Sequence, residues 1–204
     1  MNFIYFAAAI LVVISIHEAS HAYVANYLGD PTARLRGRMT LNPFAHLDIM
    51  GTLMLFIIGI GWGKPVPVDP RNFRDPVRGS AITSLAGPVS NFLTAVLLAI
   101  PLKYLTMPDV LYSFVFAVFD FSILLGVFNL LPLPPLDGSK ILGLIVPRKW
   151  HSVYAKFLYH GMKYFIIFLV IDSFVIGRFF GFSVLGVTIG TLSTLVKSVI
   201  LIGT

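Results

Sequence analysis

Residues 2–27 read NFIYFAAAILVVISIHEASHAYVANY, an apolar run whose second half holds two histidines and a glutamate. About 20 consecutive apolar residues are enough to cross a bilayer as a helix, so this stretch predicts a membrane-spanning helix. Gly29, Asp30 and Pro31 follow directly and are residues that end helices. No Lys or Arg precedes the run and no small-residue cleavage site is evident, so we expect this helix to be kept rather than removed as a signal peptide.

The composition of the whole chain agrees with a membrane protein. Of 204 residues, 57% are hydrophobic and 12% are charged, whereas soluble domains carry about 25% charged residues. An ordinary soluble protein, a disordered chain and a fibrous protein are therefore excluded. The chain has no Cys, so any metal must be held by His and carboxylates. The basic residues behind the net charge of +6 fall mostly in short loops between apolar segments, which indicates membrane topology rather than nucleic-acid binding.

The other apolar segments bring the predicted number of spanning helices to about five. Those after the first cover about 81–105, 110–131, 164–180 and 183–202. A shorter run of 14 residues, 49–62, has basic residues on both flanks, so we expect it to dip into the membrane and return. Residues 64–69 alternate Pro and Val, which suits a short extended or β element. The predicted fold class is an all-α polytopic membrane protein with a re-entrant segment.

The distribution of basic residues predicts the orientation in the membrane. Twelve of the fifteen Lys and Arg residues fall on one side if the N-terminus lies outside. Loops on the cytoplasmic side are rich in Lys and Arg, so we expect a multi-pass protein of the plasma or inner membrane with a cytoplasmic C-terminus. No loop is long enough for a second folded domain. We therefore expect one membrane-embedded domain over 1–204, with a core of about 3–147 and additional helices over about 161–203.

The predicted first helix carries the pattern His17-Glu18-Ala19-Ser20-His21. Residues four apart share one face of a helix, so His17 and His21 can bind one Zn²⁺, and Glu18 can reach a water there as general base. His17 lies nine residues before Asn26, roughly 13 Å from the end of the helix. Ionisable side chains at that depth cost roughly 2.5–3.5 kcal/mol each to insert, which favours a functional role over a polar helix end near the interface.

A catalytic zinc site commonly has three protein ligands, so a third ligand is expected elsewhere in the chain. The candidates are His46, Asp48, Asp120, Asp137, His151, His160 and Asp172. We favour Asp137, which lies in NLLPLPPLDG (129–138) at the predicted cytoplasmic end of a spanning helix. The prolines break the helix there and Gly138 permits a sharp turn, so the carboxylate can point back into the bundle. The alternative role of Asp137 is a helix N-cap.

At this point the sequence resembles the site-2 protease family of intramembrane zinc metalloproteases, peptidase family M50. The residues that carry the resemblance are His17-Glu18-x-x-His21, Gly87-Pro88-x-x-Asn91, NLLPLPPLDG (129–138), LNPFAHLD (41–48) and GKPVPV (63–68). The last two stretches are typical of small prokaryotic members, and this chain has neither the PDZ domain nor the paired CBS domains of larger members. The resemblance covers about residues 15–140.

The resemblance implies cleavage of substrate transmembrane segments, in what is called regulated intramembrane proteolysis. It implies one Zn²⁺ per chain, ligands corresponding to His17, His21 and Asp137, and a catalytic Glu corresponding to Glu18. The partners would be transmembrane protein substrates and the lipid bilayer, with no nucleic acid. The oligomeric state is left open.

Four further residues are candidates for holding a substrate. Asn129 and Asn91 can bind a substrate backbone or polarise its carbonyl, and interhelical hydrogen bonding is the alternative, which we favour for Asn91. Hydrolysis requires the substrate helix to unwind, and unwound backbone groups need hydrogen-bond partners in a dry environment. The extended stretch 63–69, with Val66 and Val68, can pair with such a substrate by strand addition. A rigid surface loop is its alternative.

Two other functions compete with proteolysis. A membrane zinc carrier would use His17, His21 and the acids at 120, 137 and 172 as a transport path, and an inactive scaffold would only bind membrane helices. A carrier needs ligands but no positioned base, and a scaffold would be expected to have a degraded motif. The complete motif with Glu18 therefore favours hydrolysis.

Overall fold

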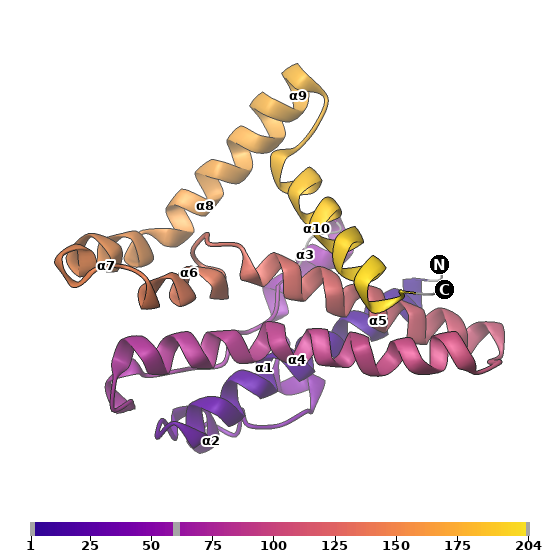
Figure 1. The fold of residues 1–204 in the computed structure, drawn as a ribbon, viewed down its shortest axis with the longest axis horizontal. Coiled ribbons are helices and arrows are strands. Elements are labelled where there is room, and N and C mark those ends of the chain that lie inside the picture. The colour runs from indigo at the N-terminus through magenta and orange to yellow at the C-terminus, as the bar shows by residue number, and fades with distance from the viewer. Residues whose placement is uncertain (1–2, 59–61, 203–204) are drawn as a thin grey trace.

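The computed structural model describes residues 3–58 and 62–202, most of which are helical (Figure 1). The helices are α1 (Phe3–Tyr27), α2 (Thr32–Leu35), α3 (Ile49–Ile58), α4 (Pro76–Tyr104), α5 (Asp109–Leu130), α6 (Asp137–Ile141), α7 (His151–Tyr159), α8 (Gly161–Val170), α9 (Gly177–Phe180) and α10 (Val184–Ile200). Single 3₁₀ turns cover Pro43–Ala45, Pro70–Asn72, Leu142–Leu144 and Arg148–Trp150, and a π-helical turn, Ile171–Ile176, joins α8 to α9.

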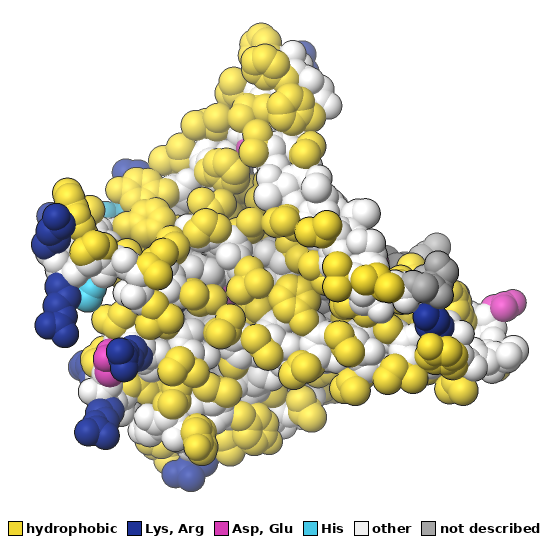
Figure 2. Space-filling view, viewed as in Figure 1, with side chains coloured by type: hydrophobic (Ala, Val, Ile, Leu, Met, Phe, Trp, Pro, Cys, Tyr) yellow, Lys and Arg dark blue, Asp and Glu magenta, His cyan; other side chains and the backbone are white. Residues whose placement is uncertain are grey.

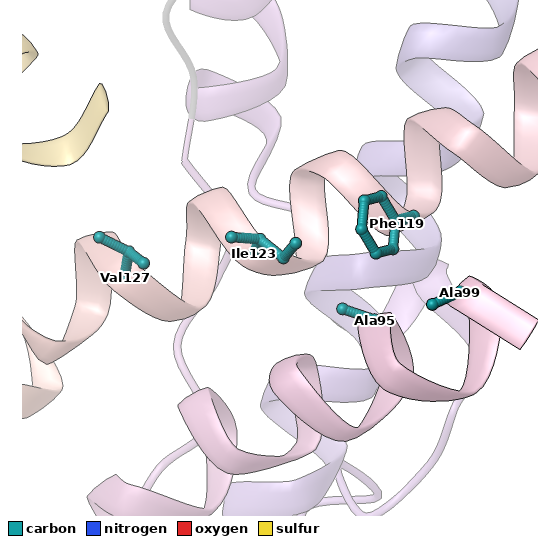
Figure 3. Close-up of a cluster of buried hydrophobic side chains, with 5 residues drawn as sticks. All are labelled: Ala95, Ala99, Phe119, Ile123 and Val127. Carbon is teal, nitrogen blue, oxygen red and sulfur yellow. The ribbon is translucent and has the colours of Figure 1, made fainter. Parts of the chain in front are cut away.

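Three long helices form the centre of the molecule, because α1, α4 and α5 all pack against one another. The close-up in Figure 3 shows Ala95 and Ala99 of α4 facing Phe119, Ile123 and Val127 of α5. A second cluster joins α1 to α5 and consists of Ala9, Val13, Ala117 and Val118. Small residues at these contacts let the helix backbones approach closely. The packing fixes the second half of α1, which carries the two histidines, beside α4.

Three of the predicted spans are confirmed. Tyr5–Tyr27, Pro76–Tyr104 and Asp109–Leu130 are long and apolar enough to cross a membrane. The helix α4 begins five residues before the predicted start, because the Asp75 side chain accepts hydrogen bonds from the N–H groups of Val77 and Arg78 and caps it.

The prediction of five spans is not confirmed. The segments predicted at 164–180 and 183–202 form a pair bent by 91°, which adds at most one span to the three. The bend is held by Asp172 of the π-helical turn, whose carboxylate accepts hydrogen bonds from the Ser183 hydroxyl (2.5 Å) and the Val184 N–H (2.7 Å) at the start of α10. An ion pair between Lys197 of α10 and Asp120 ties α10 to α5.

The predicted extended element is present as an irregular segment and not as a strand. Within 3–58 and 62–202 there is no β-strand, and residues 63–69 make one isolated antiparallel bridge, between Gly63 and Leu47. Pro65 and Pro67 cannot donate to a ladder, which explains why the pairing does not extend. The first part of the predicted re-entrant run is α3. Residues 59–61 of that run lie outside the described residues, so the re-entrant path stays a prediction.

Charged side chains are concentrated at one end of the molecule. Figure 2 shows Lys and Arg gathered at the end where α2 and α7 lie, while hydrophobic side chains cover most of the visible face between the two ends. This distribution agrees with a membrane protein that keeps most of its basic residues on one side.

Candidate metal centre

The two histidines of α1 lie side by side and face α6. His17 and His21 are one helical turn apart, and their Nε2 atoms are 3.0 Å from each other. Both residues are buried, His17 with 4% and His21 with 8% of its surface exposed. The pair therefore presents two nitrogen atoms to one point inside the helix bundle.

Asp137 reaches the same point from the start of α6. After α5 ends at Leu130, the proline-rich turn reverses the chain, and α6 begins at Asp137 itself. A Cβ atom at Gly138 would lie 2.2 Å from the Leu130 carbonyl oxygen, so only glycine fits this turn. The Oδ2 atom of Asp137 lies 3.1 Å from both histidine Nε2 atoms. The favoured third candidate from the sequence is thus the one that joins the histidines.

The three ligand atoms form a nearly equilateral triangle with sides of 3.0–3.1 Å. A tetrahedral zinc ion with bonds of about 2.0–2.1 Å holds neighbouring ligand atoms about 3.3 Å apart, so small adjustments bring the triangle to zinc geometry. Two imidazoles and a carboxylate are also a ligand set that catalytic zinc uses. The described residues therefore fit one zinc ion, with a further coordination position left for water or substrate.

Burial alone would raise the pKa of the Asp137 carboxyl, but its contacts with His17 and His21 lower that pKa below its usual range. Asp137 is therefore an anion at neutral pH. An ionised carboxylate is the form that binds a cation.

The outer ring nitrogens of the histidines also have partners, both from α4. His21 Nδ1 lies 2.7 Å from the carbonyl oxygen of Thr83, and His17 Nδ1 lies 3.1 Å from the side-chain amide of Asn91. Such contacts orient a metal-binding imidazole. Between these two residues, Gly87 passes so close that a Cβ atom there would lie 2.6 Å from each histidine Nε2. Sequence reasoning assigned no role to Gly87, although Gly87 belongs to a quoted motif, and it did not predict the contact of Thr83 with His21.

Glu18 lies next to the histidine pair and is held by the extended segment. Its Oε2 accepts a hydrogen bond of 2.8 Å from the N–H of Val66. Val66 is itself buried against Ala22 and Ala33, with Val68 packed on the same cluster. The segment 63–69 therefore positions the carboxylate of Glu18, and it also lines a cavity beside the two histidines.

One cavity of about 790 Å³ brings the predicted site residues together. Its lining includes Glu18, both histidines, Asp137, Val66, Val68 and Asn129. Asn91 is fully buried beside His17 instead of lining this cavity, and Asn129 donates from its amide nitrogen to the Leu125 carbonyl of its own helix. The interhelical hydrogen bond favoured for Asn91 is present, and its partner is the predicted zinc ligand.

Among the described residues, the other ligand candidates do not join this group. Asp120 pairs with Lys197, and Asp172 binds the start of α10. His46 Nε2 contacts the Thr40 carbonyl and His151 Nε2 contacts the Val146 carbonyl. Asp48 lines the cavity, and its Oδ1 accepts the Gly51 N–H at the start of α3. Among the described residues, only His17, His21 and Asp137 form a group that could hold a metal ion.

Asp30, just beyond α1, anchors the far end of the extended segment. It is fully buried, and its carboxylate accepts hydrogen bonds from the N–H and hydroxyl of Thr32, the amide of Asn72 and the N–H of Asp69. Burial alone would raise the pKa of Asp30, but these hydrogen bonds lower it below its usual range. Asp30 therefore fixes segment 63–69 relative to α1.

Replacing Asp30 by Ala is expected to lower the free energy of unfolding by about 2 kcal/mol, because the backbone N–H groups of Thr32 and Asp69 lose a charged acceptor. A depressed folded pKa stabilises the protein above the unfolded pKa, and this stabilisation is lost as the pH falls through the folded value. The difference between variant and wild type should thus shrink below about pH 4. Thermal unfolding in detergent at neutral and acid pH measures this, and Asp109→Ala at an exposed position is the control. An equal difference at both pH values would contradict the role of the Asp30 charge.

Comparison with known proteins assigns the chain to a family. The chain is 39% identical over 176 residues to YwhC of Bacillus subtilis strain 168, which is named as a zinc metalloprotease, and the match covers 82% of this chain and 79% of YwhC. The sequence profile of peptidase family M50 matches residues 104–171. The chain belongs to peptidase family M50. The resemblance stated from the motifs is therefore confirmed, and with it the expectation of a zinc metalloprotease.

Other M50 relatives are longer than this chain. Rip2 of Mycobacterium tuberculosis strain H37Rv, also named as a zinc metalloprotease, is 34% identical over 142 residues, which cover 67% of this chain and 55% of Rip2. The zinc metalloprotease MJ0392 of Methanocaldococcus jannaschii is 26% identical over 141 residues, covering 69% of this chain and 34% of the relative. No solved structure matches the chain.

Proposed function

We propose that this M50 metalloprotease hydrolyses peptide bonds in or near the transmembrane segments of membrane proteins, as regulated intramembrane proteolysis requires. The observation that carries the proposal is the position of His17, Glu18 and His21 inside α1, a candidate membrane span, beside a cavity of about 790 Å³. His17 lies nine residues from Asn26, roughly 13 Å along the helix. A reacting group at that depth meets transmembrane segments of other proteins rather than their soluble domains.

The residues of the site have different roles in the proposed reaction. His17, His21 and Asp137 would hold one Zn²⁺ per chain, and zinc bound there would supply Lewis acidity that polarises the scissile carbonyl. Glu18 would take a proton from the attacking water and deliver it to the leaving amine. The N–H of Val66 holds the Glu18 carboxylate in place for both transfers.

We further propose that segment 63–69 binds the unwound substrate as an added strand. The N–H groups of Lys64 and Val66 are already used by the His46 carbonyl and by Glu18, and Pro65 and Pro67 have none. The Lys64 and Pro65 carbonyls accept hydrogen bonds from Arg38, so the segment would offer its carbonyls from Val66 onward to substrate N–H groups, with Val66 and Val68 at the cavity wall. Asn129, from α5 across the same cavity, is the candidate for contacting the scissile carbonyl.

The distribution of basic residues supports a proposed orientation. We propose that the basic end of the molecule is cytoplasmic, that the N-terminus is outside and that the cavity opens toward the cytoplasm of a plasma or inner membrane. The site lies within the proposed core of residues 3–147, and residues 161–203 add the bent pair α8–α10. Both parts then belong to one membrane-embedded domain.

The proposed function predicts that helix stability in the substrate controls the rate. In proteoliposomes, a membrane-anchored substrate with Gly or Pro near the scissile bond should be cleaved faster than one with a strongly helical Leu/Ala segment, because unwinding precedes hydrolysis. Mass spectrometry of the products locates the cut. Cleavage only outside the transmembrane region of the substrate, or equal rates for both substrates, would contradict the proposal.

The strand can be tested separately with proline variants. Val68→Pro should slow cleavage while zinc content is unchanged, because it alters the proposed pairing edge without touching a ligand. Val66→Pro also removes the donor to Glu18, so it tests positioning of the base together with strand pairing. Full activity in Val68→Pro would argue against the added strand.

A further inference from the structure

The zinc site demands one particular proton arrangement on each histidine. Both His17 and His21 direct Nε2 toward Asp137 Oδ2, so a metal in the triangle would use the Nε2 lone pairs. A neutral imidazole carries one proton, and a ring that ligates through Nε2 must therefore carry it on Nδ1. That Nδ1–H needs an acceptor, because both rings are buried.

For His21 the backbone meets this demand. Its Nδ1 lies 2.7 Å from the carbonyl oxygen of Thr83, which is an acceptor only. The backbone carbonyl of Thr83 therefore fixes the Nδ1–H tautomer of His21. A side-chain substitution at residue 83 would leave that carbonyl in place.

For His17 the partner is a side-chain amide, which can either donate a hydrogen bond to Nδ1 or accept one from Nδ1–H. The amide of Asn91 lies against Nδ1, with Nδ2 3.1 Å from it, while the Oδ1 atom is buried without a hydrogen-bond partner among the residues described. Rotation of the amide by 180° about the Cβ–Cγ bond exchanges Oδ1 and Nδ2 and moves no other group. Only the orientation with Oδ1 toward the ring is compatible with zinc ligation by Nε2.

We propose that Asn91 is a positioning residue for the metal: its Oδ1 accepts from His17 Nδ1–H and so keeps the lone pair of Nε2 available for zinc. Asn91 has 0% of its surface exposed, and burying an amide costs free energy that an apolar residue of the same size would avoid. This inference rests on the ligand set His17, His21 and Asp137.

Two substitutions of similar size separate this role from space filling. Asn91→Asp keeps an acceptor and has no amide donor, whereas Asn91→Leu has neither. We expect Asn91→Leu to lower zinc affinity by about 10–100-fold, and Asn91→Asp to keep it within about threefold of wild type. If Asn91 only fills space, the order reverses, because Leu packs well and Asp buries a charge.

Zinc affinity is measured by chelator competition on the purified chain, with thermal unfolding of the zinc-stripped protein as a check on folding. Asn129→Leu is the matched control, since Asn129 bonds to its own helix, and its zinc affinity should equal that of wild type. Wild-type affinity in Asn91→Leu, or loss of affinity in Asn91→Asp alone, would overturn the role of Asn91. If Asn91→Asp does not fold, the comparison of Asn91→Leu with Asn129→Leu decides. Unchanged zinc affinity in His21→Ala would instead contradict the ligand set.

Discussion

Gly87→Ala is expected to lower zinc affinity by at least about 100-fold. A Cβ atom at this position would lie 2.5 Å from His17 Cε1 and 2.6 Å from the Nε2 atoms of His17 and His21. Real Cβ atoms essentially never come within 3.0 Å of a non-bonded atom, so the two rings must separate and the ligand triangle opens. Changing a group that only orients a metal ligand lowers metal affinity by about 10–100-fold. Gly87→Ala displaces the ligands themselves, so its effect should be larger.

The matched control is Gly190→Ala in α10, where a Cβ atom meets nothing within 4 Å. Alanine favours helices over glycine by about 1 kcal/mol, so neither substitution is expected to weaken its helix. Zinc per chain and chelator competition measure the effect. A Gly87→Ala protein that binds zinc as wild type does would show that α4 does not approach the histidines as closely as the structure has it.

Glu18→Gln is expected to reduce peptide hydrolysis by about 10²–10⁴-fold while one zinc per chain remains bound. The substitution removes the proton acceptor but keeps the side-chain shape, and its amide oxygen can still accept the Val66 N–H. Asp137→Asn should instead lower zinc occupancy together with activity, because it removes the anionic ligand. Cleavage of a membrane-anchored substrate and zinc analysis are measured on the same preparations. Full zinc in the Asp137 variant and none in the Glu18 variant would mean that the two roles are reversed.

The candidate ligand group could be predicted from sequence because local rules place its members. Helix geometry alone puts His17 and His21 on one face, and the prolines before Asp137 show where the chain must turn back. The sequence also contains a signal for the beginning of α4, since Asp75 followed by Pro76 is a typical helix start. The hydropathy pattern pointed to a later start because Arg78, Gly79 and Ser80 interrupt the apolar run near the beginning of α4.

The surroundings of the ligands could not be predicted, because they depend on how closely helices distant in sequence approach. Nothing near Gly87 in the chain indicates that it touches His17, and the pairing of Asp120 with Lys197 joins residues on different helices. The predicted five spans are not confirmed among the described residues for a similar reason. Segment length indicates whether a helix can cross a membrane, whereas the 91° bend before α10 depends on the Asp172 contact with Ser183.

Zinc K-edge X-ray absorption on the purified, zinc-loaded chain tests the central claim most directly, because it counts the imidazoles bound to the metal. The ligand set His17, His21 and Asp137 predicts two imidazole nitrogens and further oxygen atoms at about 2.0–2.1 Å. It also predicts that Asp137→Asn changes the oxygen shell while both imidazoles remain. Three or more imidazoles per zinc, or a spectrum that is the same in wild type and Asp137→Asn, would contradict it.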